Sequence, residues 1–190
     1  MLKKILLAVL VLVVGFFAYV ATRPDTFHIE RTRLVHAPPD VVYARIDDFH
    51  QWRDWSAWEH MDPAMERTFS GPAKGTGAVY TWKGNDKVGE GRMTITSAEP
   101  AKKVDIKLDF LAPFKSTSNA ALALAPADGG TSVKWTMDGN HNLMSKTMCV
   151  FMDMDKMVGG DFEKGLAALD SVATADARVA AIPDTTAGAQ

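Results

Sequence analysis

The sequence predicts an α+β protein in which a curved antiparallel sheet of six to seven strands wraps a long C-terminal helix, preceded by one N-terminal transmembrane helix. An uncharged apolar run fills residues 5–22, and short strand-like runs follow it. Apolar residues then recur at helical spacing from about residue 143. We therefore expect an anchor and linker (1–25), a folded domain (26–174) and a flexible tail (175–190).

The overall composition is that of one globular domain. The chain has 190 residues, of which 47% are hydrophobic, and a mean hydropathy of −0.07. Its 21 basic and 23 acidic residues give a net charge of −2, so no basic field would recruit nucleic acid. The single cysteine, Cys149, excludes an internal disulfide, and no Cys/His cluster indicates a metal site.

The first predicted element is a membrane-spanning helix over residues 5–22. These 18 uncharged residues would span roughly 27 Å, close to the hydrocarbon thickness of a bilayer. Cleavage of a signal sequence needs small residues at the −3 and −1 positions. A cut after Ala21 would place Tyr19 at −3, and a cut after Ala18 would place Phe16 there, and both side chains are too large. We favour an uncleaved, single-pass inner-membrane anchor over a cleaved signal or a buried core helix. Basic residues flank both ends of this helix, so their distribution does not decide its orientation in the membrane. The signal-like layout of the N-terminus favours a domain on the periplasmic or extracellular side.

The domain begins with a predicted strand over residues 27–35. Pro38 and Pro39 end this strand, and residues 39–48 predict a short helix because proline is tolerated in the first turn. A tryptophan-rich loop follows over 52–58.

Strands and one long helix complete the predicted domain. The strands are expected over residues 66–70, 78–82, 88–97, 104–110, 115–125 and 131–137. Val104, Ile106, Leu108 and Phe110 alternate with polar residues, which indicates a sheet with one buried face. A long amphipathic helix is predicted over 143–174. One helix cannot cover a broad twisted sheet evenly, so we expect the sheet to curl and to leave a cavity beneath the helix.

Several segments together suggest a known fold. They are 37–43 (APPDVVY), 49–52 (FHQW), 55–58 (WSAW), 62–65 (DPAM), 75–82 (GTGAVYTW), 89–93 (GEGRM) and 154–166 (MDKMVGGDFEKGL). In these segments the chain resembles bacterial, membrane-anchored members of the START-like (SRPBCC) superfamily, which includes polyketide cyclases, Bet v 1-type proteins and lipid-transfer domains. The resemblance covers about 26–172 and implies a helix-grip fold with a ligand cavity. It is weak for function, because one fold hosts many chemistries.

The predicted cavity is lined by side chains from the loop, the sheet and the long helix. They are Trp52, Trp55, Trp58, Tyr80, Trp82, Met93, Phe110, Trp135, Met148, Met152 and Phe162. The tryptophans of the loop are spaced by three, and each can bury roughly 150–250 Å². These tryptophans would either form one wall of the ligand pocket, pack in the core between helix and sheet, or contact the membrane at the pocket entrance. Packing in the core is the favoured alternative.

Two groups of polar residues are candidates for contact with a ligand. Glu90 and Arg92 share one strand face, where they would orient a polar head group, perform acid/base work or face solvent. The flanking glycines suit close packing by the helix on the opposite face, so solvent is favoured. His50 and His60 flank the tryptophans as candidate general bases, although surface positions are favoured.

The long helix carries three further features. Cys149 has no histidine at a helical offset to activate it, so a nucleophilic role is disfavoured. A methionine-rich stretch fills the core or lines a pocket: Met144, Met148, Met152, Met154 and Met157. Gly159 and Gly160 predict a kink in the long helix, and Asp161 would cap the part that follows. The kink would either bend the helix to follow the curled sheet or act as a hinge over the cavity.

These observations predict a membrane-anchored binding or carrier domain for a small hydrophobic ligand, lipid or isoprenoid-like. The alternatives are a polyketide cyclase/dehydratase-like enzyme and a partner-binding module of a membrane complex. No residue stands out as catalytic, and we expect no cofactor, metal or nucleic acid. The membrane contact is assigned to residues 5–22, and the sequence names no protein partner.

Overall fold

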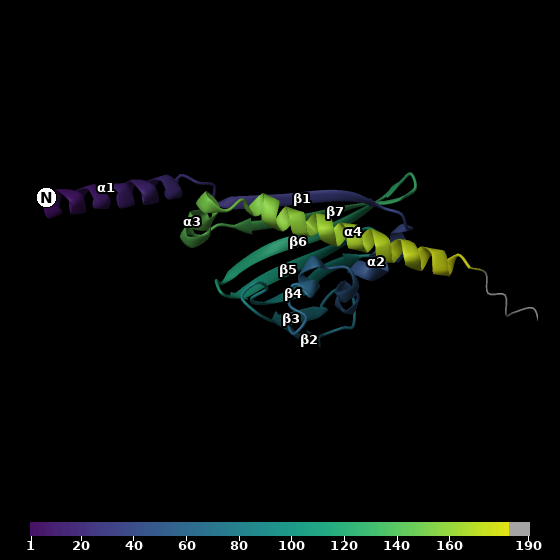
Figure 1. Ribbon diagram of the computed structural model, residues 1–190. Coiled ribbons are helices and arrows are strands. Elements are labelled where there is room, and N and C mark those ends of the chain that lie inside the picture. Colours follow the sequence, from purple (N-terminus) through teal and green to yellow (C-terminus); the bar gives the residue numbers. More distant parts are fainter. Residues whose placement is uncertain (183–190) are drawn as a thin grey trace, which may run out of the picture.

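The computed structural model describes residues 1–182, and within them a seven-stranded antiparallel sheet curves beneath a long helix (Figure 1). The strands are β1 (Thr26–Val35), β2 (Glu66–Ser70), β3 (Val79–Lys83), β4 (Glu90–Glu99), β5 (Lys103–Ala112), β6 (Ser116–Ala127) and β7 (Gly130–Asn140). Their order, β1-β7-β6-β5-β4-β3-β2, joins the first strand to the last and otherwise follows consecutive hairpins. The predicted α+β class and antiparallel sheet are confirmed.

Helical elements lie along the concave side of the sheet and at one end of it. They are α1 (Leu2–Ala21), α2 (Pro39–Ile46), the 3-10 helices η1 (Phe49–Asp54) and η2 (Ala57–His60), α3 (Leu143–Phe151) and α4 (Met154–Ala180). Helix α4 packs mainly against β1 and α2, while η1 and η2 contact its flank. Helix α1 projects away from the sheet at the end where α3 lies (Figure 1).

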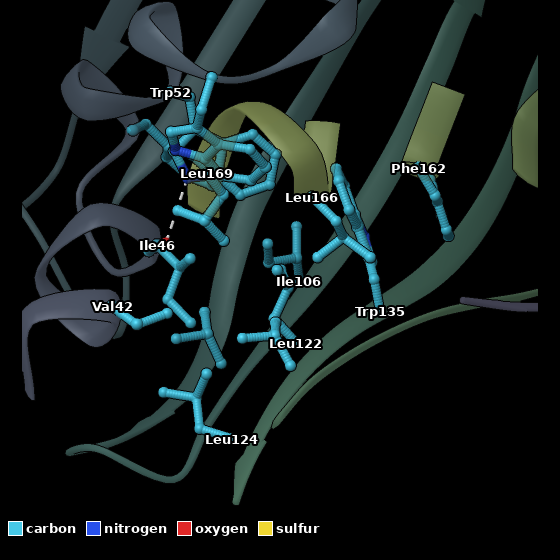
Figure 2. Packing of buried hydrophobic residues seen from close by; sticks show 14 of the residues in the cluster. Val42, Ile46, Trp52, Ile106, Leu122, Leu124, Trp135, Phe162, Leu166 and Leu169 are labelled. Atoms are coloured by element: carbon cyan, nitrogen blue, oxygen red, sulfur yellow. Dashed lines mark hydrogen bonds between the residues drawn. The ribbon is translucent and has the colours of Figure 1, made fainter. Parts of the chain in front are cut away.

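The hydrophobic core lies between the sheet, α2, η1 and α4 (Figure 2). Ile106 from β5 and Leu166 and Leu169 from α4 are each at most 2% exposed, as the alternating and helical patterns predict. The indole N–H of Trp52 donates to the carbonyl of Ile46 at 3.1 Å, which joins η1 to α2. The core therefore fixes the tryptophan-rich segment against the underside of α4.

The single helix predicted over residues 143–174 is instead two helices. The backbone is extended at Met152 (φ −129°, ψ 132°), and the side chain of Asp153 accepts a hydrogen bond from the amide of Lys156. An aspartate in this position starts a new helix by satisfying a free amide. Helix α4 then continues to Ala180, past the predicted end at 174. The rest of the predicted tail, 183–190, lies outside the described residues.

The predicted second helix segment capped by Asp161 is wrong, because α4 runs unbroken through Gly159 and Gly160 and its cap is Asp153. A Cβ on Gly159 would lie 2.1 Å from Nη2 of Arg31, whereas a Cβ on Gly160 would have no neighbour within 4 Å. Gly159 therefore lets the Arg31 guanidinium reach from β1 to the helix, where it pairs with two carboxylates of α4.

Helix α1 is long and apolar enough to cross a membrane, and it alone among the helices of residues 1–182 meets that test. An 18-residue window has a mean hydropathy of 2.6, and only 6% of it is buried. The alternative of a buried core helix is therefore wrong. Helix α1 has the length and composition of a membrane anchor or a signal sequence.

Candidate functional site

The tryptophans of the loop belong to a packed aromatic cluster with β7 and α4. The rings of Trp135 and Phe162 stack with centroids 4.2 Å apart and an interplanar angle of 5°. The centroids of Trp55 and Trp58 lie 5.4 Å and 5.8 Å from that of Trp135, and the Trp52 centroid lies 5.9 Å away. The indole N–H groups of Trp52 and Trp55 donate to backbone carbonyls of α2. These rings fill the space between β7 and α4 at this level.

A second group of predicted cavity residues lies on β3, β4 and β5. Tyr80 and Trp82 are buried, and Met93 and Phe110 are half-buried beside them. The Trp82 and Phe110 centroids lie 6.0 Å apart. A Cβ on Gly91 would lie 2.4 Å from the Trp82 ring. The bare face at Gly91 therefore accommodates an indole, not the helix that the sequence analysis expected there.

A buried polar cluster that the sequence analysis missed joins η2 to β2 and β3. Nε of Arg67 donates to Glu59 at 2.7 Å, and the Tyr80 hydroxyl donates to the same carboxylate at 2.5 Å. The Glu59 and Arg67 side chains are only 6% and 13% exposed. Burial and the bond to Glu59 raise the pKa of Tyr80 far above its ordinary value, so the hydroxyl stays protonated. In the sequence Glu59 is one acidic residue directly after the tryptophan-rich loop, and its neighbours do not indicate that it is buried.

The polar residues that the sequence offers for ligand contact or catalysis lie on the outer face of the sheet or are exposed at its edge. Arg92 is on the outer face of the sheet, where its Nη2 lies 3.4 Å from a carboxylate oxygen of Asp109. Glu90 is two residues away on the same strand face. The ring of His50 is about half exposed, and His60 is exposed. Of these side chains, only His50 touches the aromatic residues, because its ring stacks on Phe69, which in turn stacks on Tyr80.

A hollow lies at the end of the domain next to α1. This cavity, the linker pocket, has a volume of about 570 Å³. Its walls come from the α1–β1 linker, α3 and the start of α4, and include Arg23, Lys146, Cys149, Phe151, Met152 and Met154. Of the predicted cavity residues, Met152 lines this pocket, whereas Met148 lies on the exposed side of α3.

The titratable side chains of the linker pocket are largely neutral or paired. Burial, together with the nearby Lys146 ammonium, lowers the pKa of His141, so the imidazole is neutral near pH 7. Burial raises the pKa of the Cys149 thiol, which therefore stays protonated and a poor nucleophile. The Lys146 side chain is 9% exposed, and its ammonium pairs with Asp25. The pocket lining is thus mixed, with apolar side chains of α3 and α4 beside the charges of Arg23 and Asp153.

A smaller hollow of about 230 Å³ lies at the start of η1, between Phe49, His50 and Phe69. The His50 and Phe69 rings stack there with centroids 4.1 Å apart. Pockets for drug-sized ligands occupy about 300–1,000 Å³, so the linker pocket alone of these two has the usual size. Within residues 1–182 no group of three or more His, Cys, Asp or Glu side chains is placed to hold a metal ion.

Residues 26–174 match the family described as "Polyketide cyclase / dehydrase and lipid transport". The chain belongs to this family. The match spans the whole sheet and most of α4, and agrees with the resemblance stated from the sequence motifs. The polyketide cyclase-like fold supports a hydrophobic ligand-binding domain.

Solved structures share this fold at low sequence identity. The di-domain ARO/CYC StfQ of the steffimycin biosynthetic pathway matches with a TM-score of 0.59 at 10% identity, over 81% of this chain and 52% of that one. A protein from Rhizobium leguminosarum matches with 0.58 at 15% identity, over 78% and 95%. Ara h 8.0201 matches with 0.53 at 15% identity, over 79% and 99%. No curated protein sequence matches the chain.

Proposed function

We propose that this member of the polyketide cyclase-like family is a membrane-anchored binding or carrier domain for a small hydrophobic ligand, lipid or isoprenoid-like. Residues 1–25 serve as anchor and linker, and residues 26–174 as the binding domain on the periplasmic or extracellular side. One observation carries the proposal: the linker pocket opens directly beside the end of the apolar helix α1.

The walls of the linker pocket suit an amphiphile. Its volume of about 570 Å³ is in the usual range for small-molecule sites. Met152, Met154 and Phe151 offer adaptable apolar surface, because methionine is flexible and polarizable. Arg23 lies at the foot of α1, where it would meet the polar end of a ligand whose tail runs along α3.

The short linker favours capture from the bilayer. Residues 22–25 separate α1 from β1, and four extended residues reach at most about 14 Å. The pocket therefore stays within that reach of the end of the anchor. Tethering at such short range raises the effective concentration of membrane-derived ligands at the pocket.

The catalytic and partner-binding alternatives have less support. Of the side chains proposed for acid/base work, Glu90 and Arg92 lie on the outer face of the sheet and His60 is exposed. The His50 ring is about half exposed where it stacks on Phe69. The buried carboxylate of Glu59 is already engaged by two donors. No observation of comparable weight favours a protein partner.

The proposal is tested on the full chain purified from membranes, with a pair of tryptophan substitutions. Cys149→Trp adds a large ring to the linker pocket, whereas Val179→Trp, at a 69% exposed site near the end of α4, is the control. Lipid that co-purifies is quantified by mass spectrometry, and binding of a dansyl-labelled fatty acid by fluorescence. We expect both to fall several-fold in Cys149→Trp and to be unchanged in Val179→Trp.

Two results would contradict the proposal. A folded wild-type chain that carries no lipid and does not bind the dansyl-labelled fatty acid would rule out the binding function. Equal binding by Cys149→Trp and Val179→Trp would rule out the linker pocket as the site.

A further inference from the structure

Helix α3 carries its apolar side chains outward and its lysine inward. Leu143, Met144, Met148 and Phe151 are 55%, 54%, 42% and 76% exposed, whereas Lys146 is 8% exposed. At 100° per residue these four apolar side chains share one half of the helix circumference. A helix on a water-facing surface has the opposite arrangement, with charges outward. The outward face of α3 therefore has the composition of a face that contacts apolar surroundings.

The exposed apolar residues form one continuous stretch at the end of the domain. We call Leu143, Met144, Met148, Phe151 and Met152 the α3 surface. Met152, at the end of the helix, is 44% exposed. Exposed apolar patches of this kind mark sites of contact with a membrane or another molecule.

The position of α3 next to α1 identifies the contact. Helix α3 touches α1, and the rings of Phe151 and Phe16 have centroids 6.1 Å apart. Phe16 lies five residues before Ala21, the end of α1, which corresponds to about 7.5 Å along the helix axis. An amphipathic helix in a membrane interface buries its apolar face about 5–10 Å deep. When α1 spans the bilayer, Phe151 therefore reaches the depth typical of such a helix.

We propose that α3 is an interfacial helix whose α3 surface lies in the lipid bilayer beside α1. This inference rests on the proposed anchoring by α1 and adds a second membrane contact that sets the orientation of the domain. The polar groups nearby fit a headgroup region. Lys146 is neutralised by Asp25, and the Arg23 guanidinium lies 5.8 Å from the centroid of the Tyr19 ring. Tyrosine is enriched at membrane interfaces.

The docked α3 fixes how the linker pocket meets the membrane. Phe151 and Met152 belong both to the α3 surface and to the pocket wall. Insertion of α3 therefore brings the pocket to the level of the lipid headgroups. Helix α4 runs away from α1 toward its end at Ala180 (Figure 1), so it would extend away from the bilayer.

The test uses spin labels on the full chain in phosphatidylcholine vesicles. In a Cys149→Ser background, one cysteine at a time is introduced by Leu12→Cys in α1, Phe151→Cys in α3 or Val179→Cys in α4. All three sites are exposed apolar side chains, so the labels should leave the fold unchanged, which circular dichroism checks. Collision of each label with oxygen, which enters lipid, is compared with collision with a water-soluble nickel chelate.

We expect the ratio of oxygen to nickel collisions to be several-fold higher at positions 12 and 151 than at position 179. A lipid-exposed label at 12 with a water-exposed label at 151 would overturn the interfacial helix and leave the anchor intact. A label at 151 shielded from both agents would show that protein covers the α3 surface, which also overturns the inference. A water-exposed label at 12 would overturn the anchoring itself.

Discussion

Neutralising the buried carboxylate of Glu59 should destabilise the domain far more than neutralising an ion pair at the surface. Glu59→Gln keeps the side-chain shape but removes the charge that Arg67 faces at 2.7 Å. Removal of one partner of a buried ion pair costs about 3–5 kcal/mol, because the other charge remains buried without compensation. Arg67 also donates to the carbonyl of Met65, so we place the cost near the lower end, about 3 kcal/mol.

The coupling between the two charges is measured by a double-mutant cycle. Arg67→Gln should also cost about 3 kcal/mol. Glu59→Gln with Arg67→Gln should cost about the same as either single change rather than about 6 kcal/mol, since no buried charge is then left alone. The control is Arg92→Gln, whose side chain is 52% exposed in its pair with Asp109 and which should cost less than about 1 kcal/mol.

Urea unfolding of the full chain in detergent, followed by tryptophan fluorescence, measures these free energies. A cost of about 3 kcal/mol corresponds to a fall in melting temperature of about 6–12 °C for a protein of this size. Additive costs in the double variant, or a cost of Glu59→Gln no larger than that of Arg92→Gln, would refute the reasoning. The cluster would then be a solvated ion pair and would not fix η2 to the sheet.

Two further predictions concern α4. Gly160→Ala should stabilise the protein by about 1 kcal/mol, because alanine has the higher helix propensity. Gly159→Ala should lose that gain, because its Cβ would displace the Arg31 guanidinium. Equal melting temperatures of the two variants would contradict this prediction. The hydrogen bonds from Arg45 hold the pKa of Asp176 below its ordinary 3.8, so the pair stabilises the fold above that pH and stops doing so as the pH falls through the lowered pKa. Asp176→Asn should therefore be less stable than wild type at neutral pH, and the two urea midpoints should converge in acid.

The strands and helices were predictable because their side chains repeat with the period of the backbone. In β5, Val104 and Ile106 alternate with polar residues and are buried as expected. The break at Met152 was not predictable from periodicity, because apolar residues recur at helical spacing on both sides of it. The cap by Asp153 is the local signal that would have located the break.

The functional region was harder to predict than the fold, because its residues are joined by tertiary contacts. Arg67 and Glu59 are eight residues apart in different elements, and only the sheet geometry brings them to Tyr80. The role of Gly159 likewise depends on Arg31, which lies on the first strand of the sheet. Composition can indicate that polar residues are present, but it cannot indicate which of them the fold will bury.

The start of α4 and the part that carries Phe162 differ in how much packing a ligand would disrupt there. Near its middle, the stacked rings of Trp135 and Phe162 are each 2% exposed, and removal of a buried phenylalanine side chain costs about 3–5 kcal/mol. A ligand that entered there would have to separate these rings and lose their packing. At the start of α4, the pocket beside Met154 is already open, and the neighbouring Phe151 is 76% exposed. A route past α3 therefore costs less packing than one between Trp135 and Phe162, and α3 is at the end of the domain that the proposed anchor would hold against the bilayer.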